Sequence, residues 1–227
     1  MQRIVQPELL DTLSPDDPRA IHSRRDLRRV NAWMRNHAIM ARALENHWRG
    51  PVPRQIIELG AGDGNFLLSV AQKIASRWPN VNAMLLDRRK NVSAETLAAF
   101  TKLAWRAEAV VADAFDRPQM DSKIIIANLF LHHFENERLP ELLRKILKHA
   151  ELFVAIEPRR AQWPLFCSRL LWAIGCNDVT HHDAAVSVRA GFSGHELSAL
   201  WPDKNNWQLT EQHAGAFSHL FIARKMS

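Results

Sequence analysis

The sequence predicts an α/β fold with a doubly wound, mostly parallel sheet of seven strands whose last strand is antiparallel, preceded by an N-terminal helical cap. From residue 55 onward, short apolar runs alternate with stretches of helical periodicity, which is typical of buried parallel strands joined by crossover helices. Near the end of the chain, two more apolar runs are separated only by the four residues Ala214 to Phe217. Such a link is too short for a crossover helix, so these strands should pair antiparallel as a hairpin at the sheet edge.

Residues 1–50 are expected to form the cap, and residues 51–227 the main domain. Asp17 precedes Pro18, which places a capping side chain beside a proline suited to the first helical turn. Apolar side chains then recur at helical spacing, so one face of a long or broken helix should pack against the rest of the chain: Leu27, Val30, Trp33, Met34, Ile39, Met40, Ala43 and Leu44. Gly50 and Pro51 should end this helical region.

The main domain begins with five expected parallel strands and the helices between them. The strands are expected over residues 55–59, 82–87, 107–112, 123–128 and 152–157, and the helices over 64–76, 93–102 and 137–149. A further helix over 163–174, a polar segment over 175–192 and a short helix over 193–200 should precede the hairpin strands, 208–213 and 218–224. Residues 160–192 are expected to form a lid, and the side chains of the first of these helices favour a core position: Trp163, Phe166, Leu170 and Trp172.

A glycine-rich turn follows the first expected strand. Its spacing is G-x-G-x-G with an acid, Asp63, inside the loop, whereas a pyrophosphate-binding turn reads G-x-G-x-x-G. Glycines let a ligand approach the bare backbone, and an acid here repels phosphate but suits a cofactor that carries an ammonium and a sulfonium group. The candidate cofactor contacts at this turn are Glu58, Gly60, Ala61, Gly62 and Gly64.

Polar side chains also end the next three strands. Asp87, about twenty residues after the glycine turn, is placed to accept hydrogen bonds from both hydroxyls of a ribose. The carboxylate of Asp113 is placed to bind the exocyclic amine of adenine while Ala114 packs on the ring. Asn128 and Leu129 then follow the fourth strand. Taken in order, these residues favour S-adenosylmethionine as the cofactor.

Over roughly residues 55–224 the sequence resembles the class I S-adenosylmethionine-dependent methyltransferases. The resemblance lies in the glycine motif from Glu58 to Gly64, in Asp87, in Asp113, and in the segment from Asn128 to Phe134. It implies a Rossmann-like sheet of seven strands with the last antiparallel. Four further segments are similar to bacterial small-molecule methyltransferases encoded beside type III polyketide synthases: Pro7 to Leu10, the helix with Asn31, Glu157 to Arg160, and Ser187 to Phe192. This narrower resemblance implies a hydroxyl of an aromatic or polyketide-type metabolite as the acceptor.

A hydroxyl acceptor must lose its proton during methyl transfer, and histidine is the natural base near neutral pH. Two candidates are His133, after the fourth strand, and His182, in the expected lid. Neighbouring histidines in an extended segment point to opposite sides and no third ligand is implied, so no metal site is expected. The candidate acceptor contacts are Asn31 and Met34 in the cap, His132, and Arg159, which could instead bridge to the lid. The cap could equally pack without touching the acceptor.

The composition fits one folded domain that acts on a small molecule. The chain has 227 residues, of which 47% are apolar, and a formal net charge of +6. The charge favours anionic partners, but basic and acidic residues are mixed, as in residues 24–29, which is typical of a solvated helix face rather than a nucleic-acid groove. The apolar runs are too short to span a bilayer, and no apolar leader precedes Cys167 and Cys176. We therefore expect a cytoplasmic monomer or homodimer with no membrane partner and with nucleic acid disfavoured.

Two other functions stay open at this point. A nucleic-acid methyltransferase would account for the basic charge, although the segment after Asn128 lacks the Pro-Pro typical of base amino-methyltransferases. A non-catalytic protein that kept the fold for cofactor binding or scaffolding is the other alternative, because a fold indicates the cofactor better than the reaction.

Overall fold

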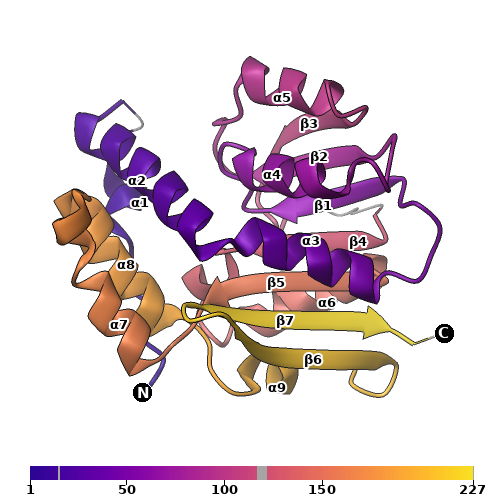
Figure 1. The fold of residues 1–227 in the computed structure, drawn as a ribbon. Helices are drawn as coiled ribbons and strands as arrows, with labels where there is room; N and C mark the ends of the chain where they lie inside the picture. The colour runs from indigo at the N-terminus through magenta and orange to yellow at the C-terminus, as the bar shows by residue number, and fades with distance from the viewer. Residues whose placement is uncertain (15, 117–121, 227) are drawn as a thin grey trace.

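A seven-stranded sheet runs through the molecule (Figure 1), and the computed structural model describes residues 1–14, 16–116 and 122–226. The strand order is β3-β2-β1-β4-β5-β7-β6. Strands β1 to β5 are parallel, and β7 is antiparallel to both β5 and β6. The strands are β1 (Gln55–Leu59), β2 (Asn82–Asp87), β3 (Arg106–Val111), β4 (Ile124–Asn128), β5 (Leu152–Pro158), β6 (Trp207–Ala214) and β7 (Ser218–Lys225). The predicted fold class is confirmed, including the C-terminal hairpin at the sheet edge.

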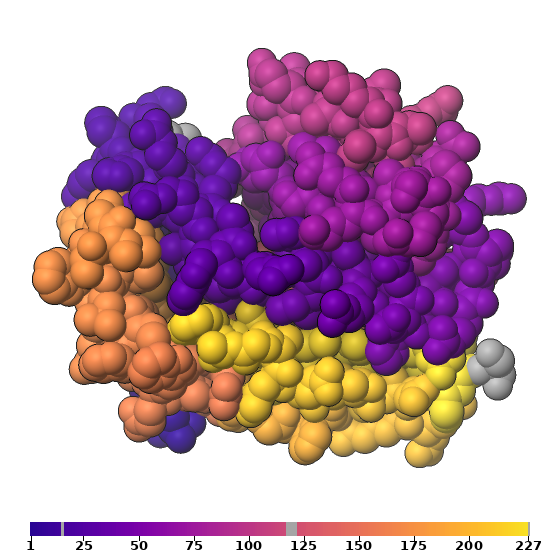
Figure 2. Space-filling view, in the orientation of Figure 1, coloured from indigo at the N-terminus to yellow at the C-terminus, as the bar shows by residue number. Residues whose placement is uncertain are grey.

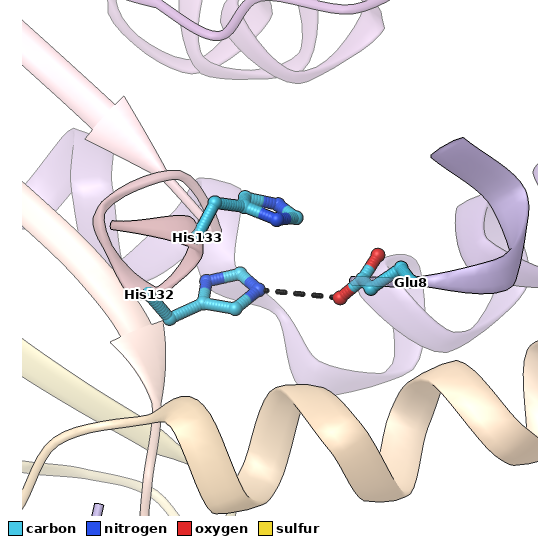
Figure 3. Close-up of side chains that lie close together, drawn as sticks. All are labelled: Glu8, His132 and His133. Atoms are coloured by element: carbon cyan, nitrogen blue, oxygen red, sulfur yellow. Dashed lines mark ion pairs between the residues drawn. The ribbon is translucent and has the colours of Figure 1, made fainter. Parts of the chain in front are cut away.

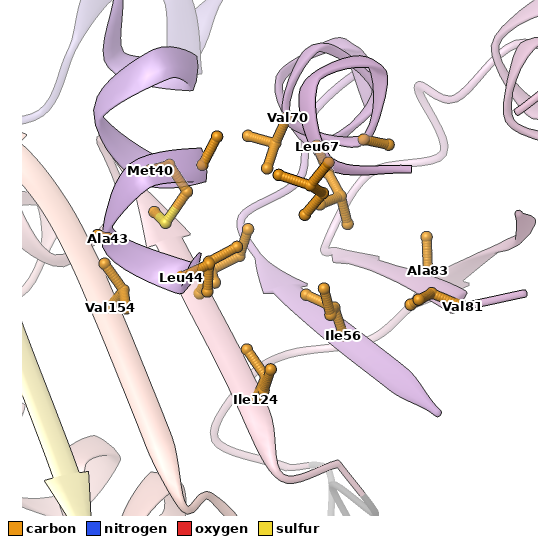
Figure 4. Close-up of a cluster of buried hydrophobic side chains, with 14 of the residues drawn as sticks. Met40, Ala43, Leu44, Ile56, Leu67, Val70, Val81, Ala83, Ile124 and Val154 are labelled. Atoms are coloured by element: carbon orange, nitrogen blue, oxygen red, sulfur yellow. The ribbon is translucent and has the colours of Figure 1, made fainter. Parts of the chain in front are cut away.

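Helices cover both faces of this sheet. On one face lie α3 (Asn36–His47), α4 (Asn65–Ile74) and α5 (Ala94–Thr101), and on the other lie α6 (Leu139–His149) and α9 (Glu196–Leu200). Figure 4 shows the first of these contacts, where Met40 and Leu44 of α3 and Leu67 and Val70 of α4 lie above Ile56 of β1. All five side chains are completely buried, as expected for a sheet covered on both faces.

The N-terminal helical region is divided into two helices, and the second of them, α3, packs on the sheet. Helix α2 (Pro18–Met34) begins with Asp17, whose carboxylate accepts from the backbone N–H of Arg19 at 2.8 Å. It ends at Arg35, which has a left-handed φ of 56° and joins α2 to α3. The apolar spacing predicted the packed face of α3, but Trp33 at the end of α2 is 70% exposed.

Five helices lie together beside the sheet and form what we call the cap from here on. It differs from the cap expected over residues 1–50, because it includes helices from the second half of the chain and not α3. It contains α1 (Leu9–Thr12), α2, α7 (Gln162–Ser168), the short 3-10 helix η2 (Leu171–Ile174) and α8 (Asp178–Ala190), with α8 in contact with each of the others (Figure 1). The sequence predicted only a polar segment where α8 lies. Four β-branched residues on its buried face obscured the helical pattern, although Asn177 caps the helix by accepting from the N–H of Thr180 at 2.9 Å.

The helix predicted over residues 163–174 is divided into α7 and η2, and its large side chains face outward. Trp163, Phe166, Leu170 and Trp172 are all exposed, so their predicted place in the core is wrong. Their spacing is that of side chains on one face of a helix, but this face is exposed to solvent rather than packed on the core. Among the described helices, none is long and apolar enough to cross a membrane.

A buried carboxylate fixes α2 to the start of α8. Asp26 is completely buried and accepts from the N–H of Asn177 at 2.9 Å and from the hydroxyl of Thr180 at 3.3 Å. Its other oxygen lies 3.7 Å from the ring of His22 and 3.5 Å from the guanidinium of Arg29. Asp26 therefore connects the two long helices of the cap.

We expect Asp26→Ala to lower the free energy of unfolding by about 3 kcal/mol, because several polar groups lose a buried charged partner. Urea denaturation would measure this change, and hydrogen exchange should become faster in α8. Asp178→Ala is the matched control, since Asp178 is exposed in the first turn of α8 and should contribute only about 0.5 kcal/mol. Equal losses in the two variants would show that Asp26 does not hold the cap together.

Candidate active site

The glycine turn after β1 lies at the carboxyl edge of the sheet, where the strand order reverses between β1 and β4. Gly60, Gly62 and Gly64 have left-handed φ values of 67°, 55° and 76°. A Cβ on Gly60 would lie 2.3 Å from the ring of Phe130, whereas a Cβ on Gly62 would meet nothing within 4 Å. The backbone of Gly62 is therefore open to a ligand, while Gly60 is needed for packing.

Asp87, at the end of β2, braces this turn. One carboxylate oxygen accepts from the N–H of Gly62 at 2.8 Å, and the other accepts from the N–H of Arg89 at 2.9 Å. The backbone bond from Ala61 to Leu86, at 3.0 Å, joins the same two segments. The carboxylate thus lies beside the open Gly62, as a contact to a ribose would require.

Glu58 is the last polar residue of β1 before the turn, and it is buried. Burial, followed by repulsion from Asp63 and Asp87, raises the pKa of Glu58 well above its usual value. Its Oε2 has no hydrogen-bond partner among the described residues. An unpartnered buried oxygen next to an open glycine backbone fits a cofactor with hydrogen-bond donors at this position.

Asp63 has another role than the one expected from the sequence. Its carboxylate accepts from the N–H of Asn65 at 3.1 Å and lies 3.3 Å from the guanidinium of Arg28 in the cap. The negative charge that was expected to face a cationic cofactor is therefore paired with a helix of the cap. A second pair, Arg89 with Asp11 at 3.5 Å, also joins the sheet edge to the cap. Figure 2 shows the surface hollowed between α2 and the part of the molecule that carries β1 and α4.

The ends of β3 and β4 complete this edge. Asp113 accepts from the N–H of Phe115 at 2.9 Å and lies 3.6 Å from the guanidinium of Arg88, and Ala114 beside it is buried.

At the end of β4, Asn128 is buried and accepts from the amide of Asn36 at 3.1 Å, while Ser218 donates to Asn36 at 2.7 Å. The register of the parallel strands brings these residues to the same edge as Asp87.

The backbone turns sharply after β4 and is held by one carboxylate. Leu129 has a left-handed φ of 53°. Glu157, completely buried at the end of β5, then accepts from the N–H groups of Phe130 at 3.1 Å, Leu131 at 2.8 Å and His132 at 3.3 Å. A charged acceptor for several N–H groups fixes the short helix η1 (Leu131–His133) and with it both histidines.

His132 is buried between two carboxylates. Its Nδ1 lies 2.9 Å from Glu157 and its Nε2 lies 3.5 Å from Glu8, which comes from the N-terminal segment (Figure 3). Burial alone would lower the pKa of His132, but the hydrogen bonds to Glu157 and Glu8 raise it to about 9. Burial would likewise raise the pKa of Glu8, but His132, His133 and the hydroxyl of Ser187 lower it to about 2. His132 is therefore held in its charged form between the two carboxylates.

Glu8 also lies close enough to the two histidines to be a third metal ligand, which the sequence did not imply. One atom from each of Glu8, His132 and His133 lies within 4.8 Å of the others, close enough to hold a metal ion. A metal ion would bind the deprotonated form of His132, so metal binding and the ion pair of His132 with Glu8 exclude each other.

The stability that Glu8 contributes is expected to depend on pH. The raised pKa of His132 means that its ion pairs stabilise the fold fully below pH 6.5 and that this contribution is lost as the pH rises through about 9. The lowered pKa of Glu8 means that its contribution is present above pH 4.5 and is lost as the pH falls toward 2.

We therefore expect Glu8→Gln to cost about 2 kcal/mol of unfolding free energy between these two limits. The cost should shrink toward both extremes, as measured by urea denaturation across the pH range. Glu151→Gln, which breaks the exposed pair with Lys123, should cost less than about 1 kcal/mol at every pH. A cost for Glu8→Gln that does not vary with pH would contradict the charged state of His132.

His133 differs from its neighbour in exposure and in charge. Its side chain is exposed, and its ring lies 4.2 Å from the ring of His132, centroid to centroid. Loss of hydration and the positive charge of His132 lower the pKa of His133 below 6.5. A neutral, accessible imidazole at the end of β4 is suited to accept a proton.

His182 lies in the cap and is tied to another carboxylate. It is exposed on α8, with its Nδ1 3.0 Å from Asp183. Asp183 also accepts from the N–H groups of Leu9 and Leu10 at 2.7 Å and 2.9 Å, so it holds α1 against α8. No contact joins His182 to the described residues at the sheet edge, whereas His133 lies next to them.

The other expected acceptor contacts lie around the cap. Asn31 and Met34 are half-buried on α2. Arg159 follows β5, where its backbone N–H donates to Phe217 at 2.8 Å, and its buried Nε has no partner among the described residues. Arg160 instead bonds Glu196 and Ser193, so it is a structural residue of the main domain.

Two residues of this site carried no signal in the sequence that would have assigned them. Glu8 and Asn36 contact His132 and Asn128 from positions more than ninety residues away along the chain. Only the folded arrangement of the cap and α3 brings them there.

Comparison with known proteins finds structural similarity without similarity of sequence. No family model matches the chain, and no curated protein matches it either. A plantazolicin methyltransferase in complex with SAH superimposes with a TM-score of 0.65 and 13% identity, over 93% of this chain and 92% of that one.

Two longer enzymes superimpose as well. A putative O-methyltransferase from Nostoc punctiforme gives a TM-score of 0.64 with 18% identity, over 99% of this chain and 64% of that one. A mitomycin 7-O-methyltransferase gives 0.63 with 17% identity, over 96% of this chain and 60% of that one. The chain therefore spans less than two thirds of the length of these two O-methyltransferases, and it has the fold that they and the plantazolicin methyltransferase share.

Proposed function

We propose that the protein transfers a methyl group from S-adenosylmethionine to a hydroxyl of a small aromatic or polyketide-type metabolite. The observation that carries this proposal is the contact of Asp87 with the open backbone of Gly62 at the reversal point of the sheet. A carboxylate beside bare backbone at this place is suited to a nucleoside ribose. The fold shared with three methyltransferases supports the same conclusion.

The cofactor contacts are assigned to the residues that end the strands. Asp87 would accept from the ribose hydroxyls, and Asp113 from the exocyclic amine of adenine, with Ala114 against the ring. The turn would supply backbone contacts from Gly60, Ala61, Gly62 and Gly64, and the unpartnered oxygen of Glu58 would accept from the amino-acid part of the cofactor. Asn128 and Leu129 would lie beside the sulfonium, which supplies the methyl group.

The acceptor side is assigned to the cap and η1. We assign the base to His133, with His182 as the other candidate, and acceptor contacts to Asn31, Met34, His132 and Arg159. The charge of His132 is already balanced by two carboxylates, so it would act through its position beside His133. Arg159, with a buried donor that lacks a partner, would orient a carbonyl or acidic group of the acceptor.

The proposal also covers the cell compartment and the oligomeric state. Cys167 and Cys176 are free thiols, which supports a reducing compartment such as the cytoplasm. A monomer or a homodimer is the proposed state in solution.

The test is binding and turnover with the purified full chain. Calorimetry should show that S-adenosylmethionine and S-adenosylhomocysteine bind, and methyl-labelled cofactor should label phenolic polyketide-type compounds. Labelling of RNA instead, with affinity that falls steeply with added salt, would support the nucleic-acid alternative. Absence of cofactor binding would reject the methyltransferase proposal altogether.

A further inference from the structure

Five large apolar side chains form an exposed surface on the cap, which we call the aromatic patch. It consists of Trp163, Phe166, Leu170, Trp172 and Ile174, with exposed fractions from 45% for Leu170 to 68% for Trp172. All five come from one short stretch of chain that contains α7, η2 and the turn between them, and the rings of Trp163 and Phe166 stack with centroids 6.0 Å apart. Single exposed apolar residues are ordinary, but a contiguous group of this kind marks an interaction surface.

The segment that carries the aromatic patch has a basic residue and no acidic one. Residues 161–177 contain Arg169 and no Asp or Glu. Arg169 is exposed next to Leu170. Arg29 of α2 reaches the same place, where its guanidinium donates to the carbonyl of Ile174 at 3.4 Å. A second copy of the chain placed on this surface in a two-fold arrangement would bring its arginines against these ones, which disfavours a homodimer here.

We propose that the aromatic patch docks on the surface of an anionic lipid bilayer. Tryptophan favours the boundary between headgroups and acyl chains, and Phe, Leu and Ile favour the layer just beneath it. Lysine and arginine beside such a surface are attracted to anionic headgroups. Apolar tips with arginines at their edge and no carboxylate among them match this kind of surface.

Such docking is compatible with the absence of spanning helices in the described residues, because the patch would lie in the interface rather than cross it. It goes against the expectation from the sequence that no membrane is involved. That expectation considered only whether an apolar run could span a bilayer, and it placed these side chains in the core. Their exposure reverses the interpretation.

The test is co-sedimentation of the full chain with vesicles of pure phosphatidylcholine and of phosphatidylcholine mixed with phosphatidylserine. We expect binding to the mixed vesicles, much weaker binding to the neutral ones, and a loss of affinity with added salt. The double variant Trp163→Ser, Trp172→Ser should bind the mixed vesicles at least about tenfold more weakly. Circular dichroism and thermal unfolding of this variant would establish that it is folded, which its exposed positions favour.

Trp33→Ser is the matched control, because Trp33 is a comparably exposed tryptophan that packs against Phe217 rather than lying in the patch. It should bind vesicles like the unaltered chain. Equal affinity for both vesicle types, no binding to either, or equal losses in the control and the double variant would each overturn the proposal. Sedimentation velocity tests the other occupant. If the unaltered chain is a dimer that binds no vesicles, and the double variant is a monomer, the patch binds a second copy of the chain instead.

Discussion

Asp87→Ala is expected to weaken the binding of S-adenosylmethionine at least about 100-fold, since hydrogen bonds to a charged group contribute about 1.5–3 kcal/mol each. The carboxylate would accept from two ribose hydroxyls, and it already holds the N–H of Gly62 in the turn. Removing it therefore takes away ligand contacts and loosens the backbone that faces the cofactor. Calorimetric titration of the cofactor into the purified variant would measure the loss directly.

Asp87→Asn separates these two contributions. The amide keeps one oxygen that can accept from Gly62 or from a hydroxyl, so an intermediate loss is expected. Asp203→Ala is the surface control, because Asp203 binds only Asn206 in the described part of the chain and should leave cofactor affinity unchanged. Retention of full affinity in Asp87→Ala would refute both the ribose contact and the cofactor assignment that depends on it.

The sequence predicted the sheet well because its signals are local. Strands β2 and β4 are short apolar runs that end in a polar residue, and the hairpin follows from the short link after β6. The strand ends could also be assigned to one edge, because parallel strands bring their carboxyl ends together. Residues such as Gly62 and Asp87 therefore fall next to each other as expected.

The cap was predicted less well because its packing is not that of an apolar helix on a core. The buried face of α2 is formed by one small apolar residue, Ala20, and two polar ones, Ser23 and Asp26. The matching face of α8 uses Thr180 and Asp183, joined to its partners by hydrogen bonds. Apolar periodicity cannot detect such an interface, and it placed the exposed tryptophans of α7 and η2 in the core instead.

The sequence also did not predict which charged residues pair, because the partners lie far apart along the chain. The sequence suggested that Asp63 suits a cationic cofactor, but it gave no sign that Arg28 pairs with Asp63 from the cap. The sequence suggested different roles for the two neighbouring histidines, a base at His133 and an acceptor contact at His132, but it did not reveal their different surroundings. His132 lies between Glu157 and Glu8, and His133 is open to solvent.

This difference leads to the second large effect, on the chemical step. His133→Ala is expected to lower kcat by about 100-fold to 10,000-fold, which is the usual contribution of a general base, with the affinity for the cofactor unchanged. The same substitution at His182 should change kcat little, because that imidazole is bonded to Asp183 on the cap. The opposite outcome, with the loss at His182 alone, would transfer the role of base to His182.

The pH dependence of kcat tests the role of His133 further, because a merely structural histidine would not produce it. The neutral ring is the form that accepts a proton, so activity should fall as the pH drops through the pKa of His133. That pKa is lowered below 6.5 by loss of hydration and by the charge of His132, which keeps the base neutral at physiological pH. In His133→Ala this acidic limb should disappear, and the remaining activity should increase with pH as a phenolic acceptor, with a pKa of about 10, ionises without help. An acidic limb that persists in the variant would show that another group takes the proton.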